Sequence, residues 1–302
     1  MASTTRWVFR FMLGVLAALA VATAGIYLAS AWRLGKTWKL PAEVVTVPTD
    51  SAAIAYGEHV AAIHRCQGCH GPDLSGASFL DAAGVLKLWA RNLTSGRGGS
   101  GATYTDGDWV RAIRHGVAAD GRGLVFMPSQ NYQRLNDHDL GALIAWLKSS
   151  PPVDAEYPAS SVGLIGRILF LKGALPLVPA EQIDHAAPRA PAVPIGPTIG
   201  YGEYLAGGCR GCHGETFSGG MIPGGFRDLL PARNLTPDNE TGIGRWTLDE
   251  FRTALRTGML PGGVQMDTLA MPVAMSRHFT DEESEALFLY FLTLPAKAYG
   301  NR

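Results

Sequence analysis

The sequence has little charge and no excess of either sign. Of its 302 residues, 26 are basic and 26 are acidic, and charged residues make up only 17% of the chain. This balance excludes the basic surface by which a general nucleic-acid-binding protein is recognised. Hydrophobic residues make up 47%, which excludes a disordered chain, and the length predicts two domains.

Cysteine is scarce, because four residues are too few for a disulfide framework in a chain of this size. The sequence also lacks sustained alternation of apolar and polar residues, which is the pattern of a half-buried strand. Helical patterns are present instead. Apolar residues within Leu140–Leu147 have helical spacing, and capping boxes begin helices at Thr247 and Thr280. We therefore predict an all-α fold.

Charge is absent from one long stretch near the N-terminus, Phe11–Ala31. A helix of this length, about 20 residues, matches the hydrocarbon core of a bilayer. Length favours a retained membrane anchor within residues 1–40, because the apolar region of a cleavable signal usually runs about 7–15 residues. A signal peptide is the alternative, since Ala22–Ala24 and Ala29–Ala31 both have the small-x-small form of a cleavage site.

The rest of the chain contains an internal repeat of two copies. The repeated segments are Tyr56–Glu58 and Tyr201–Glu203, Cys66–Gly71 and Cys209–Gly214, Arg91–Thr94 and Arg233–Thr236, and Met127–Pro128 and Met271–Pro272. Their order and spacing are kept, so we predict a tandem duplication with domains at residues 50–150 and 198–298. The linker at 151–197 is rich in proline and alanine. Its apolar stretch is expected to pack across the two domains rather than against a membrane, because its charges do not share one face.

Both copies contain C-x-x-C-H, the attachment motif of c-type haem. The residues are Cys66, Cys69 and His70 in the first copy and Cys209, Cys212 and His213 in the second. In this motif the two thiols add to the vinyl groups of the porphyrin, and the adjacent imidazole binds the iron. A thioredoxin-like pair would need a βαβ setting, and a zinc site would leave both histidines idle. The sequence therefore predicts two covalently attached haem c groups.

Met127 and Met271 are the candidate sixth ligands of the two irons. They lie 57 and 58 residues after the motif histidines, and a proline follows each. A thioether opposite imidazole raises the reduction potential and fills the position that a substrate would use. The pattern therefore favours an electron carrier over an enzyme. Met275 and Met266 lie close enough to compete with Met271.

Other polar residues are weaker candidates. Arg91 and Arg233 recur, and their side chains either neutralise haem propionates or lie on the surface. Asn92 and Asn234 begin Asn-Leu-Thr triplets that fit the glycosylation pattern, but their duplication indicates a shared loop geometry. His59 has no histidine counterpart in the second copy, so we expect it to have a packing or surface role.

The segment Asn234–Thr247, the Met-Pro loop and the start of the last helix at Thr280–Glu283 carry a family resemblance. They resemble the membrane-anchored, multihaem cytochrome c subunits of bacterial periplasmic alcohol, gluconate and sorbitol dehydrogenases. The resemblance covers about residues 50–298 and implies cytochrome c folds, His/Met ligation and electron transfer. Those subunits usually carry three haem motifs and this chain has two, so a generic dihaem respiratory carrier fits equally well.

We therefore predict a dihaem cytochrome held by a single helix in the cytoplasmic membrane of a bacterium. The haem domains are placed on the periplasmic side, because covalent haem attachment belongs to that oxidising compartment. The expected partners are a dehydrogenase or quinol-oxidising complex, a terminal oxidase or soluble cytochrome, and the membrane, with no nucleic acid. Two alternatives stay open: a dihaem peroxidase, which needs one open iron site, and a dihaem subunit of a terminal oxidase.

Overall fold

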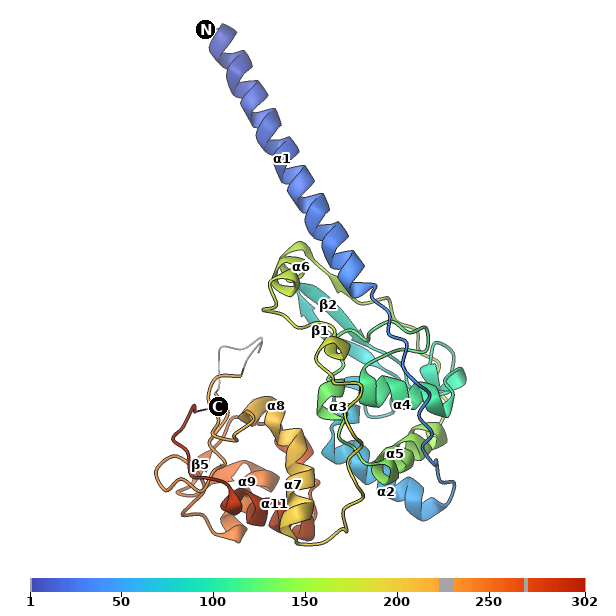
Figure 1. Ribbon diagram of the computed structural model, residues 1–302, viewed down its shortest axis with the longest axis vertical. Coiled ribbons are helices and arrows are strands. Elements are labelled where there is room, and N and C mark those ends of the chain that lie inside the picture. Colours follow the sequence, from blue (N-terminus) through green and yellow to red (C-terminus); the bar gives the residue numbers. More distant parts are fainter. Residues whose placement is uncertain (1, 223–230, 269–270, 302) are drawn as a thin grey trace.

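The computed structural model describes residues 2–222, 231–268 and 271–301. A single long helix, α1 (Ala2–Leu34), stands out from a body made of the other elements (Figure 1). The side chains of α1 are exposed along most of its length. In the described part of the chain it is the one helix long and apolar enough to cross a membrane. The apolar N-terminal segment is therefore a helix that the body does not cover.

The two copies of the repeat fold into corresponding helices. The first copy contains α2 (Ser51–Ile63), α3 (Cys66–His70), α4 (Asp106–His115) and α5 (Asp137–Ser149). The second contains α7 (Ile199–Ala206), α8 (Arg210–His213), α9 (Leu248–Thr257), α10 (Val273–Ser276) and α11 (Asp281–Thr293). Short 3-10 turns lie at Ser100–Ala102, Ser129–Asn131, Pro179–Glu181 and Gly207–Cys209. In each copy, one helix leads into the C-x-x-C-H motif and another closes the unit.

Side-chain caps begin the helices where the sequence predicts them. Thr247 accepts a hydrogen bond from the backbone of Glu250, whose carboxylate accepts one from the Thr247 backbone in return. Thr280 and Glu283 make the same capping box at the start of α11. Asn136 caps α5 at the corresponding place in the first copy. These caps satisfy amide groups that the helices would otherwise leave without partners.

A glycine lies at the closest approach of the two helices that frame each unit. A Cβ atom on Gly57 of α2 would lie 2.0 Å from the carbonyl oxygen of Ala142 in α5. A Cβ atom on Gly202 of α7 would lie 1.9 Å from the carbonyl oxygen of Ala286 in α11. No side chain fits at such distances, so the glycine of the repeated Tyr-Gly-Glu tripeptide allows the two backbones to touch.

Strands are present, so the all-α prediction is wrong in this respect, although the chain is mostly helical. A three-stranded antiparallel sheet is formed by β1 (Ala77–Ala82), β2 (Leu86–Ala90) and β3 (Ser161–Val162). The hairpin of β4 (Met259–Leu260) and β5 (Val264–Gln265) lies in the second copy. In β2, Leu86 and Leu88 are buried on either side of exposed Lys87. Three residues of alternation are too few to mark a strand in the sequence, and pairing with β3 depends on a segment far along the chain.

The apolar stretch of the linker packs on the first unit rather than across both, which corrects the expectation for that stretch. Its helix α6 (Leu164–Leu171) lies beside the base of α1 (Figure 1). Phe170 and Leu177 of the linker share a buried cluster with Leu86 and Leu88 of the sheet. The linker therefore encloses a small core of its own, to which Leu34 at the end of α1 also contributes.

We predict that Gly202→Ala destabilises the second unit by about 1–3 kcal/mol, because the added methyl group forces α7 away from α11. Denaturant unfolding of the purified chain measures this loss. Gly200→Ala is the matched control in the same helix, since its Cβ atom would meet no atom closer than 4.0 Å. That control should be neutral or stabilising by up to about 1 kcal/mol. Equal effects of the two substitutions would contradict the close crossing.

Candidate functional site

The motif of the second copy lies where α7 ends and α8 begins. Cys209 is half-buried, Cys212 is exposed and His213 is buried. The His213 Nδ1 atom donates to the backbone oxygen of Arg233 at 2.7 Å. This bond holds the imidazole in one orientation, as a hydrogen bond to the second ring nitrogen usually does in a ligating histidine.

The histidine of the first copy makes the same contact. The His70 Nδ1 atom donates to the backbone oxygen of Arg91 at 2.8 Å. Burial lowers the pKa of His70, which favours the neutral imidazole that binds metals. Both Arg91 and Arg233 are exposed, and the contact that repeats is made by their backbone. A role of their side chains at the propionates stays a prediction.

The Asn-Leu-Thr triplet fixes the loop that supplies this carbonyl oxygen. Asn92 is 1% exposed, accepts from the backbone and hydroxyl of Thr94, and donates to the oxygen of Val153 beyond α5 at 2.7 Å. Asn234 repeats these bonds with Thr236 and with the oxygen of Lys297 beyond α11. The buried asparagines act as loop anchors, in agreement with the shared geometry that the duplication indicates.

A cavity of about 590 Å³ lies beside the second motif, in the size range of cofactor sites. It is lined by Cys209, Cys212 and His213, by three methionines (Met266, Met271 and Met275), and by apolar side chains including Trp246 and Phe251. The structure therefore brings the motif together with all three candidate methionines. Two thiols, an imidazole and thioethers around an apolar cavity are the donor set that fits a covalently held haem. The choice among the methionines stays open.

The corresponding residues of the first copy surround its core. Cys66 and Met127 are half-buried and both pack against the same buried cluster. Burial raises the pKa of the Cys66 thiol to about 12, and the same cause raises that of Cys209 to about 12. Each cysteine packs against the apolar core of its own unit.

The two methionine loops also correspond. Met127 and Met271 each lie nine residues before the N-cap of the following helix. The carbonyl oxygen of each methionine accepts a hydrogen bond from the residue two positions later, at 2.8 Å from Ser129 and 2.7 Å from Val273. The equivalence of Met127 with Met271 in local structure supports their pairing in the sequence repeat, and their ligation of iron stays a prediction.

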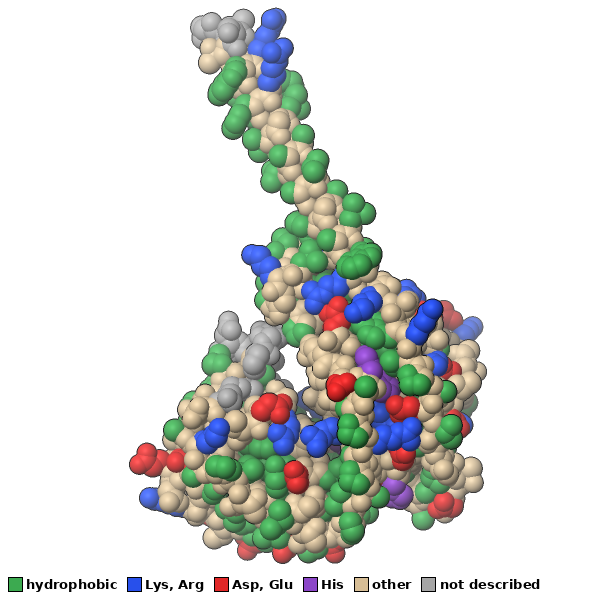
Figure 2. Space-filling view, in the orientation of Figure 1, with side chains coloured by type: hydrophobic (Ala, Val, Ile, Leu, Met, Phe, Trp, Pro, Cys, Tyr) green, Lys and Arg blue, Asp and Glu red, His purple; other side chains and the backbone are tan. Residues whose placement is uncertain are grey.

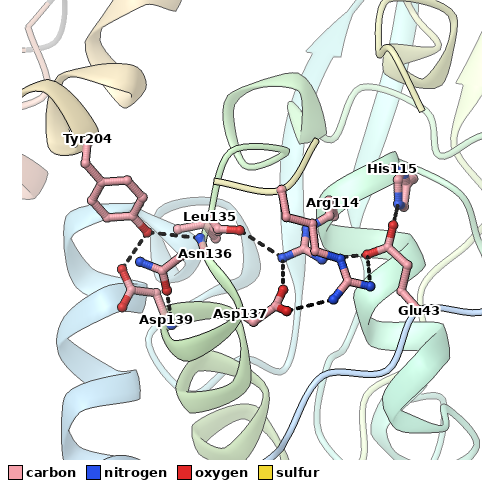
Figure 3. A network of polar contacts seen from close by, with 9 residues as sticks. Glu43, Arg114, His115, Leu135, Asn136, Asp137, Asp139 and Tyr204 are labelled. Carbon is pink, nitrogen blue, oxygen red and sulfur yellow. Dashed lines mark hydrogen bonds and ion pairs between the residues drawn. The ribbon is translucent and has the colours of Figure 1, made fainter. Parts of the chain in front are cut away.

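A carboxylate joins the two units at the N-terminus of α5. Asp139 accepts a hydrogen bond from Tyr56 of its own unit at 2.9 Å and one from Tyr204 of the other unit at 2.6 Å. The Tyr204 hydroxyl also accepts from the backbone of Asn136 (Figure 3). Along α5 and α4 the polar contacts continue through Asp137 to buried Arg114.

The same arrangement is repeated with the two units exchanged. Glu283 of α11 accepts a hydrogen bond from Tyr201 of its own unit at 3.2 Å, and it pairs with His59 of the other unit at 2.8 Å. Each carboxylate is the third residue of its helix, and each is contacted by side chains from both units. The interface thus has an approximate two-fold symmetry, which the sequence repeat did not reveal.

The proteins to which this chain is similar are cytochrome subunits. Residues 52–147 match the family described as cytochrome c oxidase, cbb3-type, subunit III. The chain is 27% identical over 285 residues to the cytochrome c subunit of alcohol dehydrogenase (quinone) from Gluconobacter oxydans, covering 83% of this chain and 56% of that protein. It is 26% identical over 284 residues to the gluconate 2-dehydrogenase cytochrome c subunit from Pantoea cypripedii, covering 82% and 61%.

A further relative is the fructose dehydrogenase cytochrome subunit from Gluconobacter japonicus, 26% identical over 278 residues, covering 84% of this chain and 56% of that protein. The chain thus spans little more than half the length of these relatives. The predicted resemblance to cytochrome c subunits of dehydrogenases is confirmed. A cytochrome c domain holds its haem covalently, so the match implies haem c in this chain.

The ion pair between His59 and Glu283 predicts a pH dependence of the interface. Hydrogen bonding to Glu283 raises the pKa of His59 above 6.5. Burial acts to raise the pKa of Glu283, but hydrogen bonds from His59 and from the Thr280 backbone outweigh it and bring that pKa below 4.5. The stabilisation is therefore complete between about pH 4.5 and 6.5, and it is lost as the pH rises through the raised pKa of His59.

We predict that this loss amounts to about 1.5–3 kcal/mol, the usual contribution of a hydrogen bond to a charged group. The matched control is His59→Tyr, because the second copy has Tyr204 at this position and a tyrosine hydroxyl does not titrate below about pH 10. Urea unfolding of both proteins from pH 5 to pH 8.5 gives the difference in stability. A difference that stays constant across this range would exclude the ion pair.

Proposed function

We propose that this chain is a dihaem c-type cytochrome that passes single electrons between redox proteins. The observation that supports it best is the duplicated hydrogen bond from the motif histidine to a loop carbonyl oxygen, at 2.8 Å for His70 and 2.7 Å for His213. In both units a hydrogen bond to a backbone oxygen holds the motif imidazole in one orientation. Because both motif histidines make this bond, it supports one haem in each unit.

The proposed attachment residues are the motif cysteines, and the proposed iron ligands are His70 and Met127 in the first unit and His213 and Met271 in the second. When bound, haem c supplies reversible one-electron oxidation and reduction of its iron. The chain's own residues attach it, orient the two imidazoles through loop carbonyl groups, and enclose it in apolar side chains that exclude water. A bound thioether favours the ferrous state and so raises the reduction potential.

The proposed organisation is an anchor within residues 1–40, cytochrome c domains at 50–150 and 198–298, and a linker at 151–197. The exposed apolar surface of α1 supports a single-pass anchor in the cytoplasmic membrane. Covalent haem attachment in an oxidising compartment favours the periplasmic side for both domains. The relatives are cytochrome c subunits of dehydrogenases. They support a dehydrogenase as the electron donor. A quinol-oxidising complex as an alternative donor, and a terminal oxidase or soluble cytochrome as the acceptor, are part of the proposal.

A second candidate is a haem-carrying subunit of a terminal oxidase. The match of residues 52–147 to subunit III of cbb3-type oxidases favours it. In that role the same two haem domains would receive electrons and pass them to a catalytic core in the membrane. The subunits that remain bound to the chain in mildly solubilised membranes distinguish the two candidates.

We predict that the mature protein is heavier than its polypeptide by two haem groups, which stay attached after denaturation. Replacing Cys66 and Cys69 by alanine should remove one haem mass, and replacing Cys209 and Cys212 should remove the other. Intact-protein mass spectrometry gives the count. Extraction of the haem into acidic acetone from the unmodified protein would show that the attachment is not covalent.

We predict that Met127→Ala opens only the first haem and Met271→Ala only the second. Each change should lower the potential of that haem and allow carbon monoxide to bind its ferrous form, because the thioether is gone. The near-infrared thioether-to-iron band of the oxidised protein should fall by half in each variant. Met275→Ala is the control and should leave the band unchanged.

Two results would revise this assignment. Loss of the second band in Met275→Ala, with Met271→Ala silent, would move the ligand to Met275 and keep the carrier function. A high-spin haem in the unmodified protein, together with turnover of peroxide, would instead favour a dihaem peroxidase.

A further inference from the structure

Three contacts fix α6 beside the last turns of α1. The Arg167 guanidinium donates to the Ser30 hydroxyl at 2.7 Å and lies 4.4 Å from the ring centre of Tyr27. Arg33 of α1 donates to the backbone oxygen of Phe170 in α6 at 2.8 Å. Arg33 is also paired with Glu181 of the linker at 2.7 Å. The linker therefore holds α6 at the level of residues 27–33 of α1 (Figure 1).

The level of α6 can be compared with the depth of a membrane. If α1 spans the bilayer, as proposed above, about 20 residues of the helix cross the hydrocarbon core at about 1.5 Å per residue. The exposed apolar side chains of α1 are continuous up to Leu28 and are followed by Trp32 and then the basic residues Arg33 and Lys36. Tryptophan and basic residues are typical of the headgroup region. The turns of α1 that hold α6 therefore lie at the membrane surface.

The surface of α6 is apolar for a helix in that position. Only Gly166 and Phe170 of its residues are buried. Ile165 is 52% exposed, and the remaining leucine and isoleucine side chains of α6 are only half-buried. An apolar helix that lies flat at a membrane surface buries such side chains between headgroups and acyl chains.

The charge around α6 is positive. Lys172 at the end of α6 and Lys36 beyond α1 are exposed, and neither is paired with a carboxylate in the parts of the chain that the structure describes. Two nearby carboxylates form ion pairs with other basic residues: Glu181 pairs with Arg33, and Asp81 of β1 pairs with Lys87. Basic side chains gather where α1 meets the body (Figure 2). Basic residues close to a membrane surface are attracted by anionic headgroups.

We propose that α6 and the base of α1 form a lipid-binding surface, by which the body rests on the anionic headgroups around its own anchor. Ile165 and its apolar neighbours enter the interface, while Lys36 and Lys172 contact lipid phosphates. This surface depends on the anchor in the proposed function, and it adds that the body is held against the bilayer rather than suspended from a free tether. Both domains then keep a constant height above the membrane.

The test uses the full-length haem-loaded protein in lipid nanodiscs, with single added thiols and a water-soluble maleimide. The variants are Ile165→Cys in α6, Leu16→Cys in the middle of α1, and Asp249→Cys in α9, where the native side chain is 92% exposed. Each labelling rate is divided by the rate in the denatured protein, and label on the unmodified chain is subtracted. In discs containing phosphatidylglycerol, the thiol of Ile165→Cys should react on the order of tenfold more slowly than that of Asp249→Cys, because a thiol in apolar surroundings ionises poorly.

The labelling rates at positions 16 and 165, each compared with that at position 249, distinguish failure of the lipid-binding surface from failure of the membrane anchor. A protected Leu16→Cys together with a fully reactive Ile165→Cys would overturn the lipid-binding surface and leave the membrane anchor intact. A reactive Leu16→Cys would overturn the anchor itself, and the proposed surface with it.

The role of the headgroup charge is tested separately. Replacing phosphatidylglycerol by phosphatidylcholine, or adding Lys172→Glu in discs that contain phosphatidylglycerol, should raise the labelling rate of the Ile165→Cys variant. The rate of the Asp249→Cys variant should stay the same in all discs. A labelling rate at position 165 that is indifferent to both changes would overturn the assignment of anionic lipid as the ligand.

Discussion

The close contact of two helix backbones in each unit is the constraint on which the other features depend. At Gly57 and at Gly202 the backbone of one helix touches a carbonyl group of its partner, and any side chain would separate them. The first helix of each pair ends at the C-x-x-C-H motif, so its position sets where the cysteines and the histidine lie. The second helix ends shortly before Val153 or Lys297, whose backbone oxygen accepts a hydrogen bond from the asparagine of the Asn-Leu-Thr triplet. One crossing thus places both the imidazole and the carbonyl group that orients it.

The same crossing builds the interface between the units. Tyr56 and Tyr201 precede the two glycines, so each lies beside the helix crossing and reaches the carboxylate near the start of its partner helix. The opposite unit then adds Tyr204 to one carboxylate and His59 to the other. Because duplication kept these positions, two copies of one domain associate much as two subunits of a symmetric dimer do. At the position of Tyr204 the first copy has His59, whose pKa is raised by its hydrogen bond to Glu283.

The two units differ in what surrounds them. The first carries the three-stranded sheet, α6 and the base of α1, which share one buried cluster. The second carries none of these, and its cavity is bordered by the small β4–β5 hairpin. Under the proposed function, the first haem domain is therefore joined firmly to the anchor, whereas the second is held through the first by the carboxylate interface. An electron donor or acceptor in the membrane would meet these two domains in different settings.

Local spacing by itself determined the attachment motifs, the equivalent methionine loops, the helix caps at Thr247 and Thr280, and an apolar N-terminal segment of spanning length. Each depends on residues within a few turns of one another, and duplication made the pattern visible twice. The sequence also marked the Tyr-Gly-Glu and Asn-Leu-Thr segments as repeated without showing what they do. Their roles required the tertiary structure, because the partners of Gly57 and Asn92 lie about 60 to 85 residues away.

Only the tertiary structure decided the sheet, the packing of the linker and the pairing of the two units. The alternation in β2 extends over three residues, and it becomes a strand because α6 and the linker cover its apolar side. The linker's apolar residues could have been buried against either domain or a membrane, and composition does not distinguish among these. Asp139 and Glu283 looked like ordinary helix-start residues. They became interface residues because folding brings a tyrosine or histidine from the other unit within hydrogen-bonding distance, a result of three-dimensional contact that no local spacing encodes.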